Sequence, residues 1–320
     1  MNDERAEMRG RYAIDRRRLL CGIATGATAA VAYGALGRAA SAFAADATNK
    51  AFTVTTVNHL SYSSKNYNVT RDFYVDLFGM RNVWDDGTKC QLDCGPEDAP
   101  NSFYMTGAKP GAEPTVAHFA FGLPEYWKVV GELKNELLRR GLPGVHPDGE
   151  AGWFVNGPSG YVQHIVTVKD PAMFPGAAAP CEVARSAKCK DAYAVGLKNL
   201  DSVPKPSGKG FKALYFKYIV LRVPDVAREA DFYVSVMGMK AVSQQKDDVA
   251  LRFGENTLRL RPSGAGKPYC NEFGFVVDNY DEAKVKAELE RRGIASQPNP
   301  AGGLMLKDPN GLEIGIGGKA

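Results

Sequence analysis

One pattern of residues occurs twice in this chain, and the repeat limits the folds that the chain can adopt. Three motifs recur in the same order, namely Phe73-Tyr74-x4-Gly79-Met80 as Phe232-Tyr233-x4-Gly238-Met239, Arg139-Arg140-Gly141 as Arg291-Arg292-Gly293, and Gly157-Pro158-Ser159-Gly160 as Asp308-Pro309-Asn310-Gly311. The first pair is separated by 159 residues. An interval above about 100 residues is too long for a solenoid repeat, so it indicates two duplicated domains.

The length and composition agree with a globular protein of two domains. The 320 residues include 44% hydrophobic and 24% charged residues, which are ordinary values for a globular chain. Residues 169–210 are rich in Ala, Pro, Gly and Lys and lack the periodicity of a helix or strand. We therefore predict a first domain over 51–168, a linker over 169–210 and a second domain over 211–317.

The N-terminal segment is typical of an export signal. Arg16-Arg17-Arg18 precedes an Ala/Gly-rich run and then Ala42-Phe43-Ala44, which predicts a twin-arginine signal over 1–44, cleaved after about Ala44. An uncleaved membrane anchor is the alternative, but the run is too poor in large apolar residues for a strong spanning helix. The mature protein is then expected in the periplasm or outside the cell, without stable membrane insertion.

The charge of the chain lies mostly in this N-terminal segment. It carries 7 of the 40 Lys and Arg and 4 of the 36 Asp and Glu, which leaves 33 against 32 in the remainder. No basic run with interleaved aromatic residues follows, so nucleic acid is not an expected partner. A small molecule is the expected ligand, and the oligomeric state stays open.

Five cysteines follow the predicted cleavage point. In an oxidising compartment Cys181 with Cys189, and Cys90 with Cys94, form candidate disulfides that leave Cys270 alone. For Cys90 and Cys94 a disulfide or free thiols are favoured over zinc binding, because the neighbouring sequence offers no further ligands.

The elements of each half follow from hydrophobic spacing. In the first half we predict strands at 52–60, 82–84, 89–93, 102–105, 116–122, 153–155 and 161–167, with helices ending at Gly79 and spanning about 125–140. The second half resumes with a strand over 211–223 and a helix that Asp225 caps. Each half then consists of two βαβββ units.

These motifs resemble the vicinal oxygen chelate superfamily, which includes glyoxalase I, bleomycin-resistance proteins and extradiol dioxygenases. The resemblance rests on the Phe-Tyr-x4-Gly-Met helix end, the terminal Asp-Pro-x-Gly turn and the duplication. It implies an α+β fold of two tandem domains, each with two βαβββ units that form a cupped mixed β-sheet. It also implies metal ligands on the first strand of each unit and on the last strand.

The three positions that this resemblance assigns to metal ligands hold His59, His118 and His164. Many members have Glu at the last position, so His164 is a departure that leaves the metal open between iron, which is favoured, and zinc, manganese or copper. The corresponding residues of the second half are Tyr218, Glu272 and Gly315. The second domain is therefore expected to lack metal, whereas two-domain extradiol dioxygenases usually hold it in their C-terminal half.

Five other residues are weaker candidates for the site. His146 could act as an acid or base or be an exposed loop residue, and Glu272 could be a base, a fourth ligand or a solvated strand residue. Tyr104, Phe121 and Trp153 could line the cup or belong to the core.

The leading functional hypothesis is an exported, metal-dependent dioxygenase that cleaves or oxidises a phenolic or other vicinal-oxygen substrate chelated to a three-histidine metal. A glyoxalase-type lyase or isomerase is the second hypothesis. That chemistry usually uses a carboxylate base beside the metal, and here Glu272 or His146 would have to supply the base. A resistance-type protein that only sequesters a small ligand is the third, and such proteins typically lack metal ligands.

Overall fold

The computed structural model describes residues 52–97, 99–148, 152–168 and 199–319. The predicted export signal, most of the predicted linker, and Cys181 and Cys189 lie outside these residues. Within them, no helix combines the length and apolar character that a membrane span requires.

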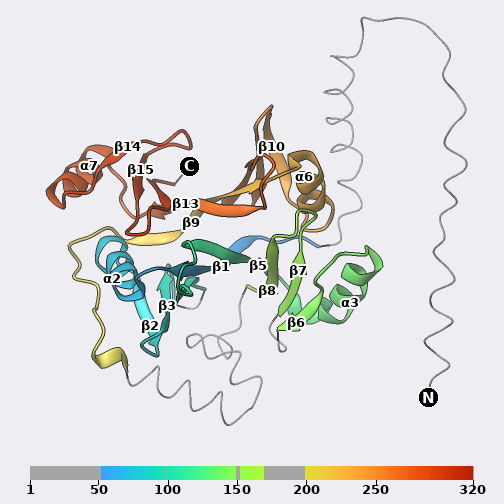
Figure 1. Cartoon of the computed structure of the whole chain (residues 1–320), viewed down its shortest axis with the longest axis horizontal. Helices are drawn as coiled ribbons and strands as arrows, with labels where there is room; N and C mark the ends of the chain where they lie inside the picture. Colours follow the sequence, from blue (N-terminus) through green and yellow to red (C-terminus); the bar gives the residue numbers. More distant parts are fainter. Residues whose placement is uncertain (1–51, 98, 149–151, 169–198, 320) are drawn as a thin grey trace, which may run out of the picture. The chain divides into compact units, whose positions relative to one another are not determined.

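The described residues of the first half form eight strands and two helices (Figure 1). In chain order they are β1 (Thr56–Ser64), α2 (Tyr67–Phe78), β2 (Arg81–Asp85), β3 (Lys89–Cys94), β4 (Asn101–Gly107), β5 (Thr115–Leu123), α3 (Tyr126–Arg139), β6 (His146–Asp148), β7 (Gly152–Asn156) and β8 (Val162–Thr167). All the predicted elements are present, and the short strand β6 is an addition.

The second half repeats this order after the 3-10 turn η2 (Asn199–Asp201). Its elements are β9 (Ala213–Val223), α6 (Val226–Ser235), β10 (Lys240–Gln245), β11 (Asp248–Phe253), β12 (Asn256–Pro262), β13 (Tyr269–Val277), α7 (Glu282–Arg291), β14 (Ser296–Pro298), β15 (Leu304–Lys307) and β16 (Glu313–Gly317). Asp225 caps α6 as predicted, because its side chain accepts a hydrogen bond from the backbone N–H of Arg228.

Each half forms one eight-stranded mixed sheet with the same topology. The strand orders are β2-β3-β4-β1-β5-β8-β7-β6 and β10-β11-β12-β9-β13-β16-β15-β14. The pairs β1/β4 and β5/β8 are parallel, as are β9/β12 and β13/β16. The predicted α+β fold with two tandem domains is confirmed.

The two faces of the first sheet have different roles. One face carries Leu60, Leu92, Phe103, Phe119 and Ile165, which are fully buried in the hydrophobic core. Because neighbouring residues of a strand point to opposite faces, the alternate residues of the same strands face the other way. We call that second face, which carries His59, His118 and His164, the histidine face.

The glycines of one repeated motif lie where the two halves contact each other. Gly79 ends α2 with φ +62°, and a side chain there would come within 2.7 Å of the carbonyl oxygen of Phe211. A side chain at its counterpart Gly238, with φ +68°, would come even closer to the carbonyl oxygen of Phe52. A glycine is needed at both positions, since the left-handed conformation and the close approach each exclude a side chain.

Two asparagines form a reciprocal pair of contacts between the halves. The Asn101 side chain accepts a hydrogen bond from the backbone N–H of Phe216 at 3.0 Å, and Asn256 accepts one from that of Val57 at 3.2 Å. These contacts join equivalent strands of the two sheets, so they fix both halves to each other with approximate twofold symmetry.

The Asp308-Pro309-Asn310-Gly311 turn docks on the first half. The Asp308 carboxylate accepts hydrogen bonds from the hydroxyls of Tyr62 at 2.6 Å and Tyr74 at 3.1 Å, and from the backbone N–H groups of Asn310 and Leu312. Asp308 is buried. The equivalent turn of the first half places the N–H of Ser159 on the Glu229 carboxylate at 3.0 Å.

We expect Asp308→Ala to lower the free energy of unfolding by roughly 2–4 kcal/mol, because two buried hydroxyls and two N–H groups would lose their acceptor. Chemical denaturation monitored by fluorescence measures this change. Asp231→Ala, at an exposed position of α6, is the matched control and should stay within about 0.5 kcal/mol of the unmodified protein. Equal effects of both substitutions would contradict the role given to Asp308.

The suggested disulfide between Cys90 and Cys94 is wrong. Both residues lie on β3 and are buried free thiols, as is Cys270. A strand advances about 3.3 Å per residue, so positions four apart lie roughly 13 Å from each other, beyond the reach of a disulfide. Burial also raises the pKa of the Cys270 thiol to about 12, which makes that thiol unreactive at neutral pH.

Candidate metal centre

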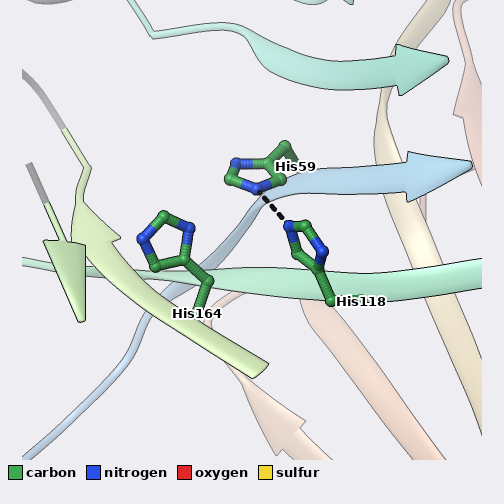
Figure 2. A group of neighbouring side chains, drawn as sticks. All are labelled: His59, His118 and His164. Carbon is green, nitrogen blue, oxygen red and sulfur yellow. Dashed lines mark hydrogen bonds between the residues drawn. The ribbon is translucent and has the colours of Figure 1, made fainter. Parts of the chain in front are cut away.

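The three predicted histidine ligands meet on the histidine face of the first sheet (Figure 2). His59 lies on β1 and pairs with Ala120 of β5, which in turn pairs with His164 of β8. His118 lies on β5 two residues before Ala120, opposite Ser61 of β1. The pairing of three central strands therefore brings together side chains that are up to 105 residues apart in the sequence.

The spacing of the three imidazoles suits one metal ion. The Nε2 atoms of His59 and His118 are 3.3 Å apart, and one ring nitrogen from each of the three residues falls within a 4.8 Å group. With metal–nitrogen bonds of about 2.1 Å, adjacent ligand nitrogens of a tetrahedral or octahedral site are roughly 3.0–3.4 Å apart. His59 and His118 are thus already at coordination distance, and His164 needs a small inward shift.

The surroundings keep the three imidazoles neutral, which is the form that binds metal. His59 and His164 are only 5% and 3% exposed, while His118 is half-buried. Burial is the main cause that lowers the pKa of all three, to about 4 for His118, to about 3 for His164 and well below its ordinary value for His59. The mutual proximity of the rings lowers the pKa of His59 and His164 further.

These pKa values predict that the metal-free protein loses stability in mild acid. The unfolded chain binds protons on these histidines below pH about 6.5, whereas the folded protein resists protonation until about pH 4, so the free energy of unfolding falls as the pH drops between these values. Urea denaturation at pH 7 and pH 4.5 measures the loss. His118→Phe should show a smaller loss, and an equal loss in both proteins would contradict this explanation.

Two aromatic side chains contact the histidines directly. The Tyr104 ring lies edge-on to His59 with ring centroids 4.6 Å apart. Phe154 stacks on His164 at 4.2 Å with an interplanar angle of 11°, and it is also edge-on to His118. Phe154 is not among the residues predicted from the sequence, whereas its neighbour Trp153 is.

The expectation that Trp153 and Phe121 line the site is corrected by the strand register. Phe154 pairs with His164 across β7 and β8, so Trp153 points to the opposite face, where Lys134 of α3 lies 6.0 Å from its ring centroid. Phe121 follows His118 by an odd number of residues and packs in the core against Tyr233 and Phe253 of the second half. Neither ring is on the histidine face.

His146 and Glu272 do not join the three-histidine group. His146 is exposed, and its Nδ1 lies 2.8 Å from the carbonyl oxygen of Gly144. Its ring stacks on the Phe154 ring with the centroids 5.0 Å apart. Glu272 belongs to the second sheet, where its carboxylate accepts a hydrogen bond from Arg261 at 2.8 Å. It is 3% exposed, so the alternative of a solvated strand residue is wrong too.

The second domain fills the corresponding place with a tyrosine. Tyr218 pairs with Gly274, which pairs with Gly315. In the first sheet His59 likewise pairs with Ala120, which pairs with His164. The Tyr218 ring lies directly over both glycines, where an added Cβ would collide with it, and Asn299 donates a hydrogen bond to its hydroxyl at 2.9 Å. The predicted counterparts of the histidines are therefore in register, and no metal group forms among the described residues of this sheet.

Comparisons with known proteins agree on the fold. The profile of the Glyoxalase/Bleomycin resistance protein/Dioxygenase superfamily matches residues 215–316, within the second domain. No curated protein matches the chain. One similar solved structure is the 2,3-dioxygenase LapB from Pseudomonas sp. KL28. Its TM-score is 0.62 and its identity 14%, and the match covers 84% of this chain and 94% of that one.

A second similar structure is the Mn(II)-bound glyoxalase from Novosphingobium aromaticivorans, with TM-score 0.59, 16% identity and coverage of 82% of this chain and 81% of that one. A third is a variant of homoprotocatechuate 2,3-dioxygenase from Brevibacterium fuscum, with TM-score 0.60, 14% identity and coverage of 84% of this chain and 72% of that one. At these identities the likeness establishes the shared two-domain fold.

Proposed function

We propose that this chain is a metal-dependent dioxygenase that acts on a phenolic or other vicinal-oxygen small molecule. The observation that carries the proposal is the buried three-histidine group, which lies in a fold shared with two 2,3-dioxygenases. His59, His118 and His164 would hold the metal, with iron favoured and zinc, manganese or copper as alternatives. The bound metal would supply a site at which substrate oxygens and dioxygen are brought together.

The residues around the histidines would shape the substrate site. Tyr104, Ser61 and His118 lie side by side on β4, β1 and β5, and all three are half-buried. Solvent therefore reaches this side of the histidine face. The aromatic ring of Tyr104 there favours a flat, partly apolar substrate. Phe154 would restrict the His164 ring to one plane.

A glyoxalase-type lyase is the second candidate, since one similar structure is a Mn(II)-bound glyoxalase. Among the described residues, no carboxylate belongs to the three-histidine group. Proton transfer next to a polarised carbonyl usually relies on a carboxylate base beside the metal. The geometry therefore favours the dioxygenase, and it also favours either enzyme over a protein that only sequesters a ligand.

Oxygen uptake by the iron-loaded protein tests the proposal. With a panel of catechols and related diols, we expect uptake that depends on iron and is absent in His118→Ala. Anaerobic turnover of a 2-oxoaldehyde hemithioacetal would instead support the lyase. Full activity of a metal-free preparation would refute both.

We also propose that the protein is exported through the twin-arginine pathway and cleaved after about Ala44, as Arg16-Arg17-Arg18 and the following Ala/Gly-rich run suggest. N-terminal sequencing of the protein from the periplasmic fraction tests this. A mature N-terminus near residue 45 is expected, and full-length protein confined to the cytoplasm would contradict it.

A further inference from the structure

We propose that Asn58 is a positioning residue that holds His59 in the tautomer able to bind metal. The inference deepens the proposed metal site and rests on it. Three observations carry it: a β-bulge at Asn58, the hydrogen bonds of Asn58 with Thr167 and with His59, and a different residue at the same place in the second domain.

The bulge brings Asn58 beside the ligand that follows it. In the pairing of β1 with β5, Val57 is opposite Phe121 and His59 is opposite Ala120, so Asn58 has no partner of its own. An unpaired extra residue turns its side chain out of the regular alternation. Asn58, which is buried, thereby reaches the His59 ring instead of pointing to the opposite face.

The hydrogen bonds of Asn58 determine which nitrogen of His59 carries the proton. The amide Nδ2 of Asn58 donates to the backbone carbonyl of Thr167 at 3.3 Å. A carbonyl can only accept, so the Oδ1 atom of Asn58 is the one that lies 2.9 Å from Nδ1 of His59. Because Oδ1 also only accepts, Nδ1 of His59 must be protonated.

Protonation of Nδ1 leaves the other ring nitrogen of His59, Nε2, able to bind metal. A neutral imidazole with its proton on Nδ1 has its lone pair on Nε2. That Nε2 is the atom 3.3 Å from Nε2 of His118, inside the three-histidine group. Asn58 therefore leaves the lone pair of His59 Nε2 facing the metal position. Its hydrogen bond to Thr167 also connects this part of β1 to β8, the strand that carries His164.

The second domain serves as an internal comparison. The bulge is kept, because Phe216 is opposite Phe275 and Tyr218 is opposite Gly274, which leaves Lys217 in the place of Asn58. The following residue there is Tyr218, which needs no tautomer control. The bulge is thus a property of the duplicated fold, whereas the asparagine occurs only in the half that has the histidines.

Two substitutions and a control test this role. Asn58→Leu keeps the size of the side chain and removes both hydrogen bonds, whereas Asn58→Asp keeps an acceptor for Nδ1–H and loses only the donor to Thr167. Lys217→Met alters the equivalent bulge of the metal-free domain. Affinity for Zn²⁺ is measured by competition with a chromophoric chelator, and the tautomer of His59 by long-range ¹H–¹⁵N NMR of the metal-free protein.

We expect Asn58→Leu to weaken Zn²⁺ binding by about 10–100-fold, the usual effect of losing an outer partner of a ligand. Its His59 should show a mixture of tautomers. Asn58→Asp should keep the Nδ1–H tautomer and most of the affinity, and Lys217→Met should match the unmodified protein.

The inference is overturned if Asn58→Leu binds Zn²⁺ within twofold of the unmodified protein, or if His59 of the unmodified protein has its proton on Nε2. Where Asn58→Leu does not fold, Asn58→Asp decides, and loss of the Nδ1–H tautomer in that variant also overturns it. If the unmodified protein binds no Zn²⁺ at all, the proposed metal site fails, while the NMR measurement still tests the hydrogen-bond role of Asn58.

Discussion

His118→Ala is expected to abolish tight binding of a divalent metal. The substitution removes one of three nitrogens in a group that contains no carboxylate to replace it among the described residues. The loss of affinity should exceed the roughly 100-fold upper range for outer partners, since a ligand itself is removed. Isothermal titration with Zn²⁺, Mn²⁺ and anaerobic Fe²⁺ measures the change.

His146→Ala is the matched control for this experiment, because it removes the remaining histidine of the chain, which is exposed and outside the group. Its metal affinity should be unchanged. Comparable losses in both variants, or unchanged affinity in His118→Ala, would contradict the assignment of the metal site to the three histidines.

Gly152→Ala is expected to disable the site without changing any ligand. A Cβ atom on Gly152 would overlap Nε2 of His164 and come within 2.8 Å of a methyl group of Val166. The ring cannot turn freely away, because Phe154 stacks flat on it. The substitution should lower the free energy of unfolding by about 1–3 kcal/mol and weaken metal binding at least as much as the loss of an outer partner.

Gly131→Ala is the control for this second prediction. Gly131 lies in α3, and a Cβ atom there meets nothing within 4 Å. Alanine is the better helix former by about 0.5–1 kcal/mol, so this variant should be slightly more stable and should bind metal normally. Normal metal binding by Gly152→Ala would contradict the described packing of His164.

The sequence was sufficient for the fold because the duplication repeats its strongest signals. The Phe-Tyr-x4-Gly-Met helix ends lie at contacts between the halves, and both halves carry them. The turn at Asp308 also contacts the other half, although its first-half equivalent has Gly157 in place of the aspartate. The same repeat placed the second-half counterparts of the histidines correctly, as the pairing of Tyr218, Gly274 and Gly315 shows.

Single-residue register explains most of what the sequence analysis missed. A shift by one residue moves a strand side chain to the other face, which separates Trp153 from Phe154. Centring the β7–β8 hairpin on its Pro158-Ser159-Gly160 turn would have paired Phe154 with His164 and identified the right ring. The odd spacing from His118 would similarly have excluded Phe121.

Other features depend on contacts that no local pattern records. The bulge that turns Asn58 toward His59 has no Gly or Pro to mark it in β1. Glu272 of β13 is held by Arg261 of β12, and β9 lies between these two strands in the sheet. The repeat alone does not connect the two residues. Cys90 and Cys94 lie on one regular strand, which separates them.

Anomalous diffraction from crystals of the protein, purified without chelators and supplied with Fe²⁺ under anaerobic conditions, tests the central claim most directly. The expected result is one metal ion per chain, about 2.1 Å from a ring nitrogen of each of His59, His118 and His164. Histidine rings that keep their positions with no metal between them, or a metal bound elsewhere, would contradict the account.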